Sequence, residues 1–334
     1  KNKPQRKPKL SFRPPNGSIL KITDFNSKLP LIDQDSYMDL DDISFLNHSL
    51  INSKKIVVVS GAGISVAAGI PDFRSSNGLF QGLSDQTTKG GNGKQLFDYQ
   101  SVYRSPELMV KFHEMVKSLF KMSLAYKPTL FHKFLNYLSM DSRLLRLYTQ
   151  NIDCFETQLS QLQTNIPLSS LDDAPKTIQL HGNVQIMGCT KCKYISKLNP
   201  EIFNSLSNNT ELPICPECEE METVRKVVGK RSVGCGNLRP RIVLYNEFHP
   251  DGEIIGSISS KDLLRKPDSL IIVGTTLKIP GVRRLVKELT RVVHYNKGCV
   301  IWINIEEPSM SVVDYLEFID LIVVGDCQDI PLIL

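Results

Sequence analysis

The chain has 334 residues, of which 41% are hydrophobic and 22% charged, and its formal net charge is +5. These values are ordinary for a globular protein, and the length allows one large domain or two modest ones with a sizeable core. No apolar run approaches the ~18 residues that a membrane span needs, so we expect neither a membrane span nor a membrane partner.

Residues 1–36 are predicted to form a basic, flexible tail. Residues 1–21 hold seven lysines and arginines and no acid, together with four prolines. So few apolar groups do not offset the entropy that is lost on ordering the chain. The positive charge fits a nuclear-targeting signal or a patch for an acidic partner, and it also fits a solvated tail without either role.

Beyond the tail, short apolar runs alternate with amphipathic segments of helical period. The runs are residues 56–60, 143–149, 177–180, 241–245, 269–275, 299–304 and 320–324. The predicted helices are residues 37–51, 105–122, 127–138 and 280–295, the second with Ser105 as its N-cap and Pro106 at its first position. This alternation predicts an α/β fold with a doubly wound, mostly parallel sheet.

Residues 183–240 interrupt the alternation, because the apolar runs shorten and paired cysteines appear. We therefore predict a small inserted module within a discontinuous large domain of residues 37–182 and 241–334. The cysteines form two Cys-x2-Cys pairs, Cys189 with Cys192 and Cys215 with Cys218.

The two pairs are predicted to hold zinc. Each pair can bring two thiolates to one ion, and two pairs complete a tetrahedral site. Since no segment has the form of a secretory signal, we expect metal ligands in a reducing compartment in preference to disulfides or free thiols. Four thiolates leave no open position for water, so the predicted Zn²⁺, one ion per chain, is structural.

A compact polar motif follows each apolar run: SGAGIS, TQNID, LHG, LYNE, GTT, NIE and GDC. In open parallel sheets, ligands bind outside the carboxyl ends of the strands. The motifs therefore predict a single ligand crevice along one edge of the sheet.

The first motif is a glycine turn that follows a buried strand. Gly61 and Gly63 leave little side chain in the way of a phosphate, which their backbone N–H groups can hold. Val66 stands where a dinucleotide fingerprint has its third glycine, and the acid expected about 20 residues later is missing. The turn favours a phosphate site over a plain turn, and it argues against an ordinary hydride-transfer dehydrogenase.

The next two motifs offer groups for recognition and catalysis. Gln150, Asn151 and Asp153 fit the binding of amide or ribose groups, and an Asn or Asp here also fits a helix cap. His181 at the crevice fits a general base, or else a packed bystander. The remaining histidines are expected to be bystanders: His48, His113, His132, His249 and His294.

Together these motifs resemble the sirtuins, the NAD-dependent protein deacylases. The match consists of GAGISVAAGIPDFRS, YTQNID, HG, the two Cys-x2-Cys pairs, IVLYNE, GTTL, IN and a late GDC, in the order of the family, over residues 52–330. The YNE variant and the basic N-terminal residues are similar to a fungal nuclear branch that deacetylates histone H3. The resemblance implies a Rossmann-like NAD-binding domain that carries a small zinc module.

The resemblance also implies which residues bind the co-substrate NAD. The first glycine loop would wrap phosphates and ribose, TQNID would form the nicotinamide pocket, and the last motifs would hold the adenosine. The implied NAD contacts are Gly61, Ala62, Gly63, Ile64, Asp72, Phe73, Arg74, Gln150, Asn151, Ile152, Asp153, Gly274, Thr275, Thr276, Asn304, Ile305, Glu306 and Cys327.

The implied function is an NAD-dependent lysine deacetylase that yields nicotinamide, O-acetyl-ADP-ribose and free lysine. His181 and Asn151 would be catalytic, and the substrate strand would consist of Val243, Leu244, Tyr245, Asn246 and Glu247. The implied partner is an acetylated histone, and the implied role is transcriptional repression in the nucleus.

Several points stay open at this stage. Asn246 replaces the glycine of the family's Phe-Gly-Glu, which leaves the peptide preference open. Residues 219–240 are longer and more basic than a minimal zinc module, and they either touch a chromatin partner or form a loop. A mono-ADP-ribosyl transferase that uses the same NAD site, and a non-enzymatic chromatin-binding module, are the alternative functions.

Overall fold

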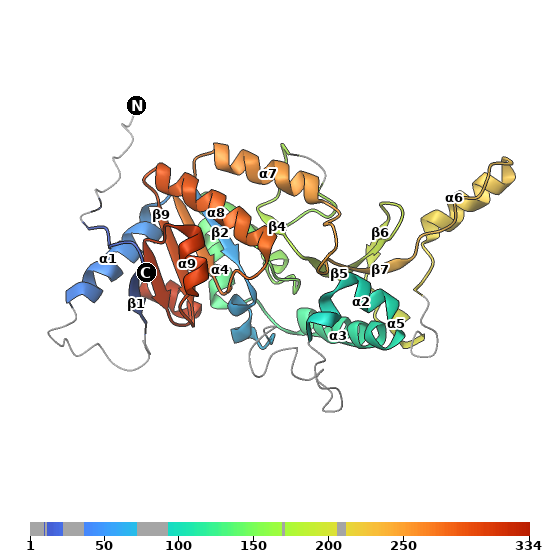
Figure 1. Cartoon of the computed structure of the whole chain (residues 1–334), viewed down its shortest axis with the longest axis horizontal. Helices are drawn as coiled ribbons and strands as arrows, with labels where there is room; N and C mark the ends of the chain where they lie inside the picture. Colours follow the sequence, from blue (N-terminus) through green and yellow to red (C-terminus); the bar gives the residue numbers. More distant parts are fainter. Residues whose placement is uncertain (1–9, 11, 23–36, 72–92, 169–170, 206–211) are drawn as a thin grey trace.

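The computed structural model describes residues 10, 12–22, 37–71, 93–168, 171–205 and 212–334. These residues form a large lobe around a seven-stranded sheet and a small lobe around a three-stranded sheet (Figure 1). No helix within these ranges is both long enough and apolar enough to cross a membrane.

The large sheet is parallel throughout, in the strand order β1-β10-β9-β8-β2-β3-β4. Its strands are β1 (Ser18–Lys21), β2 (Ile56–Ser60), β3 (Leu144–Thr149), β4 (Thr177–Gln179), β8 (Ser269–Val273), β9 (Cys299–Asn304) and β10 (Leu321–Val324). The chain leaves β2 toward β3 on one side and later returns to place β8 on the other side. Such a switch point opens a crevice at the carboxyl ends of the strands.

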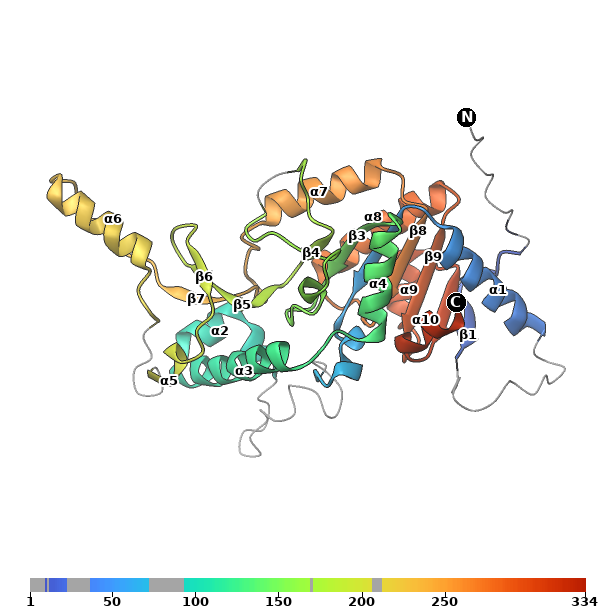
Figure 2. The ribbon, with the colours of Figure 1, turned by 180° about the vertical axis from the view of Figure 1, so that it is seen from behind.

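Helices cover both faces of this sheet (Figures 1 and 2). Alternate residues of a strand point to opposite faces, so Ile56 and Val58 pack with α1 and α4, whereas Val57 and Val59 pack with α7, α8 and α9. The helices of the large lobe are α1 (Tyr37–Asn52), α4 (Leu130–Met140), α7 (Gly252–Leu264), α8 (Pro280–Tyr295), α9 (Met310–Leu316) and α10 (Ile330–Ile333). The predicted doubly wound sheet is confirmed.

A buried ion pair fixes α7 to the sheet. Arg146 on β3 donates from Nε to Asp262 Oδ2 at 2.7 Å and from Nη2 to Oδ1 at 2.9 Å, and Tyr148 donates its hydroxyl to the same carboxylate. Both ionised side chains are almost fully buried, so their mutual pairing offsets the cost of removing them from water. This contact holds α7 over the edge of the crevice.

In the described part of the chain, the small lobe contains the antiparallel sheet β6-β5-β7 and four α-helices. Its elements are α2 (Tyr99–Arg104), α3 (Pro106–Ala125), β5 (Gly182–Cys189), β6 (Ile195–Lys197), α5 (Ile202–Ser205), α6 (Pro216–Val227) and β7 (Leu238–Ile242). Phe112, Met115, Val116 and Leu119 form one apolar stripe of α3, and this stripe joins the cluster that contains β5 and β7. The small lobe therefore contains residues 93–125 in addition to residues 183–240. The division of the chain into a large domain and a module inserted at residues 183–240 stays a prediction.

The structure differs from the predicted flexible tail at residues 18–21. They form β1, which pairs in parallel with β10, and Leu20 is buried. Arg13 also donates from Nε to Asp320 Oδ1 at 2.8 Å. Ladder hydrogen bonds and this ion pair compensate for the entropy of ordering the segment.

The apolar run at residues 241–245 was expected to be a strand of the parallel sheet, and this prediction was wrong. The strand there is β7, which pairs antiparallel with β5 in the small lobe. Leu238, Pro240 and Ile242 are buried, and the side chains of Arg239 and Arg241 between them are each 13% exposed and paired with Glu247 and Asp251. Apolar and ion-paired side chains thus alternate between the two faces of the strand.

Candidate active site

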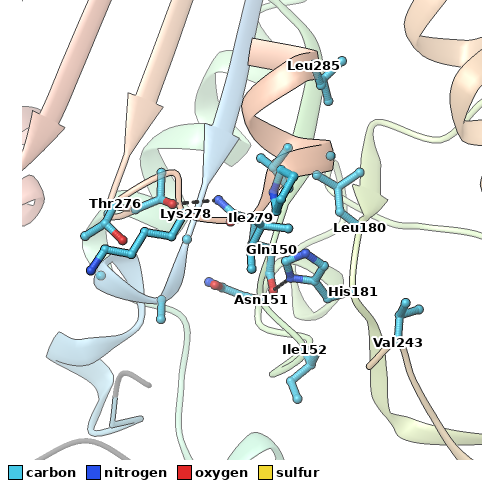
Figure 3. A pocket seen from close by; sticks show the side chains of 18 of the residues that line it. Gln150, Asn151, Ile152, Leu180, His181, Val243, Thr276, Lys278, Ile279 and Leu285 are labelled. Atoms are coloured by element: carbon cyan, nitrogen blue, oxygen red, sulfur yellow. Dashed lines mark hydrogen bonds between the residues drawn. The ribbon is translucent and has the colours of Figure 1, made fainter. Parts of the chain in front are cut away.

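The carboxyl ends of the parallel strands open into a cavity of about 1480 Å³, whose far wall is the small lobe (Figure 3). The strand-end motifs converge there as the sequence predicts. The predicted residues that line it are Gly61, Ala62, Gly63, Gln150, Asn151, Ile152, His181, Val243, Leu244, Tyr245, Asn246, Glu247, Gly274, Thr275, Thr276, Asn304, Ile305, Glu306 and Cys327.

Two glycine loops pack backbone against backbone at the floor of the cavity. The Gly61 N–H donates to the Val273 carbonyl at 3.0 Å, and the Gly63 N–H donates to the Gly274 carbonyl at 2.9 Å. A Cβ on Gly63 would lie 2.6 Å from Gly274 Cα, and Gly274 has a φ of +61°. Only glycine fits this approach, which leaves an open, side-chain-free surface for a phosphate.

Gln150 ties the end of β3 to the neighbouring strands. Its Nε2 donates to Thr275 Oγ1 at 2.9 Å (Figure 3). The same nitrogen donates to the Ser60 carbonyl at 3.2 Å. These bonds fix the loop that carries Asn151 into the cavity.

Asn151 is oriented by a buried chain of hydrogen bonds. Its Nδ2 donates to Ser65 Oγ at 3.2 Å, and Ser65 Oγ donates to Asp153 Oδ2 at 2.6 Å. Burial raises the pKa of Asp153, against the opposing effect of the hydrogen bonds that its carboxylate accepts from Ser65 Oγ and from the Phe155 N–H. Asn151 Oδ1 is buried and has no hydrogen-bond partner among the described residues.

Glu156, which the motifs did not single out, supports this loop from below. Thr149 Oγ1 donates to Glu156 Oε1 at 2.6 Å and accepts from the Asn151 N–H at 3.1 Å. Burial, with the nearby charge of Asp153, raises the pKa of Glu156 to about 8. Burial thus favours the neutral form of this carboxyl group.

His181 is held as a neutral base. Its Nδ1–H donates to the Gln150 carbonyl at 3.0 Å, which leaves the lone pair on Nε2 (Figure 3). Burial lowers the pKa of His181, and the neighbouring His249 lowers it further, against the bond to Gln150. A neutral imidazole oriented by a backbone carbonyl is suited to take a proton from a ligand.

The four paired cysteines meet in the small lobe. Their Sγ atoms lie within 4.8 Å of one another, with Cys189 and Cys218 at 3.7 Å and Cys192 and Cys215 at 3.6 Å. Zinc–sulfur bonds of about 2.3 Å in a tetrahedron place sulfurs roughly 3.8 Å apart. The cluster therefore fits the predicted Zn²⁺, and none of its cysteines lines the cavity, in agreement with a structural ion.

The comparisons agree with this geometry, since the Sir2 family model matches residues 61–281. The chain belongs to the Sir2 family. It is 48% identical, over 98% of its length and 88% of the relative, to the NAD-dependent histone deacetylase HST4 of Saccharomyces cerevisiae. It is 50% identical, over 86% of its length and 67% of the relative, to the NAD-dependent protein deacetylase hst4 of Schizosaccharomyces pombe.

Solved structures show the same fold. A Sir2 homologue solved as a complex with NAD superposes with a TM-score of 0.61 at 21% identity, covering 87% of this chain and 93% of that one. A Sir2 protein bound to a propionylated peptide superposes with a TM-score of 0.58 at 22% identity, covering 86% and 93%. The predicted sirtuin resemblance is thus confirmed.

In this sirtuin, residues 243–247 form the cavity wall opposite the glycine loops. The Val243 N–H donates to the His181 carbonyl at 2.9 Å, and the Tyr245 N–H donates to the Phe97 carbonyl at 2.6 Å. Asn246 has a φ of +63° and donates from Nδ2 to Asp98 Oδ2 at 2.6 Å. Asparagine tolerates this left-handed backbone better than most residues, which explains how it takes the place of the family's glycine.

Two groups of predicted residues do not line the cavity as described. Asp72, Phe73 and Arg74 lie outside the described residues. Ile64 and Asp153 are buried behind the cavity and do not line it, so they position its wall.

His249 and Phe97 are among the residues of the cavity wall that the motifs did not single out. His249, expected to be a bystander, donates from Nε2 to the Gln179 carbonyl at 3.2 Å and accepts from the Asp251 N–H at 2.9 Å. Phe97 follows no apolar run, and backbone pairing brings it to the site: its carbonyl accepts from the Tyr245 N–H, and the Tyr99 N–H donates to the Tyr245 carbonyl. Its proximity is a product of tertiary structure that no local pattern could reveal.

Proposed function

We infer that this sirtuin is an NAD-dependent lysine deacetylase whose substrate is an acetylated histone. The observation that carries this inference is the neutral His181, which the Gln150 carbonyl holds between Asn151 and the wall of residues 243–247. Two relatives, both fungal, bear the names NAD-dependent histone deacetylase and NAD-dependent protein deacetylase, which supports the activity and the histone substrate.

The cavity has a place for each part of NAD. The glycine loops at Gly61–Gly63 and Gly274 offer a side-chain-free surface on which the pyrophosphate can lie, and Thr275 and Thr276 add hydroxyl groups. Asn304 and Glu306, at the end of β9, are assigned to the adenosine ribose, and Cys327 is assigned to the adenine. Gln150 and Asn151 then face the nicotinamide end.

The reaction requires that acetyl-lysine and NAD bind together, with the acetyl oxygen in line with the glycosidic bond of NAD. The acetyl oxygen bonds to the anomeric carbon of the ribose while nicotinamide leaves with the electrons of the glycosidic bond. His181 Nε2 then takes a proton from a ribose hydroxyl, whose oxygen attacks the acetyl-derived carbon. Water then adds to this carbon, its bond to the lysine nitrogen breaks, and the lysine amine leaves with a proton. The products are nicotinamide, O-acetyl-ADP-ribose and lysine. Holding both reactants in one cavity makes the first step effectively unimolecular.

Zinc has no part in these steps. Bound to Cys189, Cys192, Cys215 and Cys218, it would cross-link the strands and helices of the small lobe. Since β7 leads directly into residues 243–247, the ion would hold the substrate wall in place from a distance.

A histone substrate places the protein's action in the nucleus. The basic N-terminal residues and the basic residues that follow α6 are consistent with work on chromatin, where they would face acidic surfaces.

The proposed function is tested with a panel of acetylated histone peptides, each incubated with the protein in the presence and absence of NAD. We expect loss of the acetyl group from at least one peptide, only with NAD, as a mass decrease in the peptide. Transfer of ADP-ribose to protein while the peptides stay acetylated would instead indicate the transferase, and no NAD turnover would indicate a binding module.

A further inference from the structure

The helix α6 and the chain that follows it project from the small lobe, away from both sheets (Figures 1 and 2). We call residues 223–235, which comprise the last part of α6 and the segment after it, the tip. No residue of the tip lines the described cavity, and none belongs to the cysteine cluster. Its role therefore lies outside the chemistry and the metal site described above.

The tip is folded back on itself in a defined way. Glu222 on α6 accepts from the Val233 N–H at 2.8 Å and from the Ser232 hydroxyl. Arg225 donates from Nε at 2.9 Å and from Nη2 at 2.7 Å to the Arg231 carbonyl. Lys191, beside the cysteine cluster, donates to the carbonyl of Val233. These bonds pre-organise the tip, which lowers the entropy cost of binding.

The surface of the tip is both apolar and basic. Val224, Val227, Val228 and Val233 are 51%, 82%, 58% and 56% exposed. The acids of α6 (Glu217, Glu219, Glu220 and Glu222) all precede the tip. Residues 223–235 contain four basic side chains and no acid. Apolar side chains that gather on one projecting element are typical of a protein-binding surface.

We propose that the tip docks onto an acidic, partly apolar protein face of the nucleosome that carries the acetyl-lysine. This contact is separate from the catalytic cavity. The inference rests on the proposed function, because it takes the histone substrate from there. The cations of the tip complement the acidic face, and the valines lose their water-exposed area on docking.

The valines favour a protein partner over a nucleic acid. Binding to a phosphate backbone is driven by cations and by the release of counterions, so exposed valines add little to it. A protein face can bury them, and a few buried side chains carry most of the energy of such an interface.

The experiment compares two substrates for the full chain: nucleosomes with an acetylated histone, and a short acetylated peptide from the same histone. Two tip variants are made, one with Lys226→Glu, Lys230→Glu and Arg231→Glu, and one with Val224→Ser and Val228→Ser. The matched control, Lys121→Glu, Lys127→Glu and Lys133→Glu, makes the same change in net charge at exposed lysines elsewhere. Binding of each protein to naked DNA is measured in parallel.

We expect both tip variants to lose about tenfold or more in kcat/KM on nucleosomes through a higher KM, with unchanged turnover of the peptide. The control variant should keep both activities. An equal loss on the peptide, an equal loss in the control, or no loss at all would overturn the docking surface. A loss confined to the charge variant and matched by weaker DNA binding would overturn it in favour of a nucleic-acid contact. If the unmodified protein fails to deacetylate the peptide, the proposed function itself has failed.

Discussion

At the scale of single residues, the proposed catalysis depends on the protonation state of His181. The Gln150 carbonyl fixes the proton on Nδ1, and burial lowers the pKa of the ring. The base is therefore ready at neutral pH, and the acidic limb of a pH profile reports its loss as the ring gains a proton.

Replacing His181 with alanine tests this role. We expect kcat to fall about 10²- to 10⁴-fold, while the melting temperature and zinc content stay unchanged because the ring lines a cavity. The acidic limb of kcat/KM in the unmodified enzyme should lie below pH 6.5, the ordinary value for histidine. His294→Ala, at an exposed ring stacked on Phe318, is the matched control, and a fully active His181→Ala protein would rule out the base.

Glu156 predicts a pH dependence of stability. Its pKa is raised from 4.5 to about 8, so the folded state binds this proton more tightly than the unfolded state. The free energy of unfolding therefore falls as the pH rises through that interval, each pKa unit being worth about 1.4 kcal/mol.

The substitution Glu156→Gln isolates this effect, because the amide keeps an oxygen for Thr149 and cannot ionise. Urea denaturation of both proteins from pH 5 to pH 8 should give a flatter stability profile for the variant. Parallel profiles would mean that Glu156 is already ionised in the folded protein.

At the scale of elements, the contact between the two glycine loops is decisive. In Gly63→Ala, the new Cβ would lie 2.6 Å from Gly274 Cα, so one loop must move. We expect a cost of about 1–3 kcal/mol in stability and a KM for NAD raised about tenfold or more. Gly188→Ala, where the added atom meets only the Arg241 side chain at 3.7 Å or more, should change neither quantity, and normal NAD affinity in Gly63→Ala would refute the phosphate site.

The second prediction at the scale of elements concerns the small lobe and its zinc site. Cys215 and Cys218 belong to the same apolar cluster as Phe112 of α3. Loss of the ion should therefore destabilise the whole small lobe and not only the two cysteine pairs. We expect Cys189→Ser to abolish zinc binding, measured by metal analysis, and to abolish cooperative thermal unfolding of the lobe. Cys235→Ser, at an exposed thiol outside the cluster, should retain both, and a metal-free protein that is folded and active would contradict the structural role.

At the scale of the whole molecule, the sequence predicts the helices and strands that local patterns of apolar and polar residues encode. The predicted helix at residues 280–295 is α8 with the same bounds, because Pro280 starts it and the apolar stripe is strong. β2, β8 and β9 likewise follow from continuous apolar runs, and the motifs after them do converge.

What depends on pairing between distant segments could not be predicted. β1 becomes a strand only because it adds to β10, about 300 residues away, and β7 pairs with β5 in the other lobe. The Phe97 carbonyl accepts from the Tyr245 N–H, and the His249 ring donates to the Gln179 carbonyl. These contacts between distant segments bring both residues to the cavity. Glu156 carries no motif of its own, and its importance follows from burial.

The central claim is that NAD is consumed stoichiometrically in removing an acetyl group from lysine. Its most direct test is mass spectrometry of all products after one incubation of the protein with NAD and an acetylated histone peptide. The account predicts one nicotinamide and one O-acetyl-ADP-ribose for each lysine freed. Release of free acetate without consumption of NAD, or ADP-ribose attached to protein while the peptide stays acetylated, would contradict it.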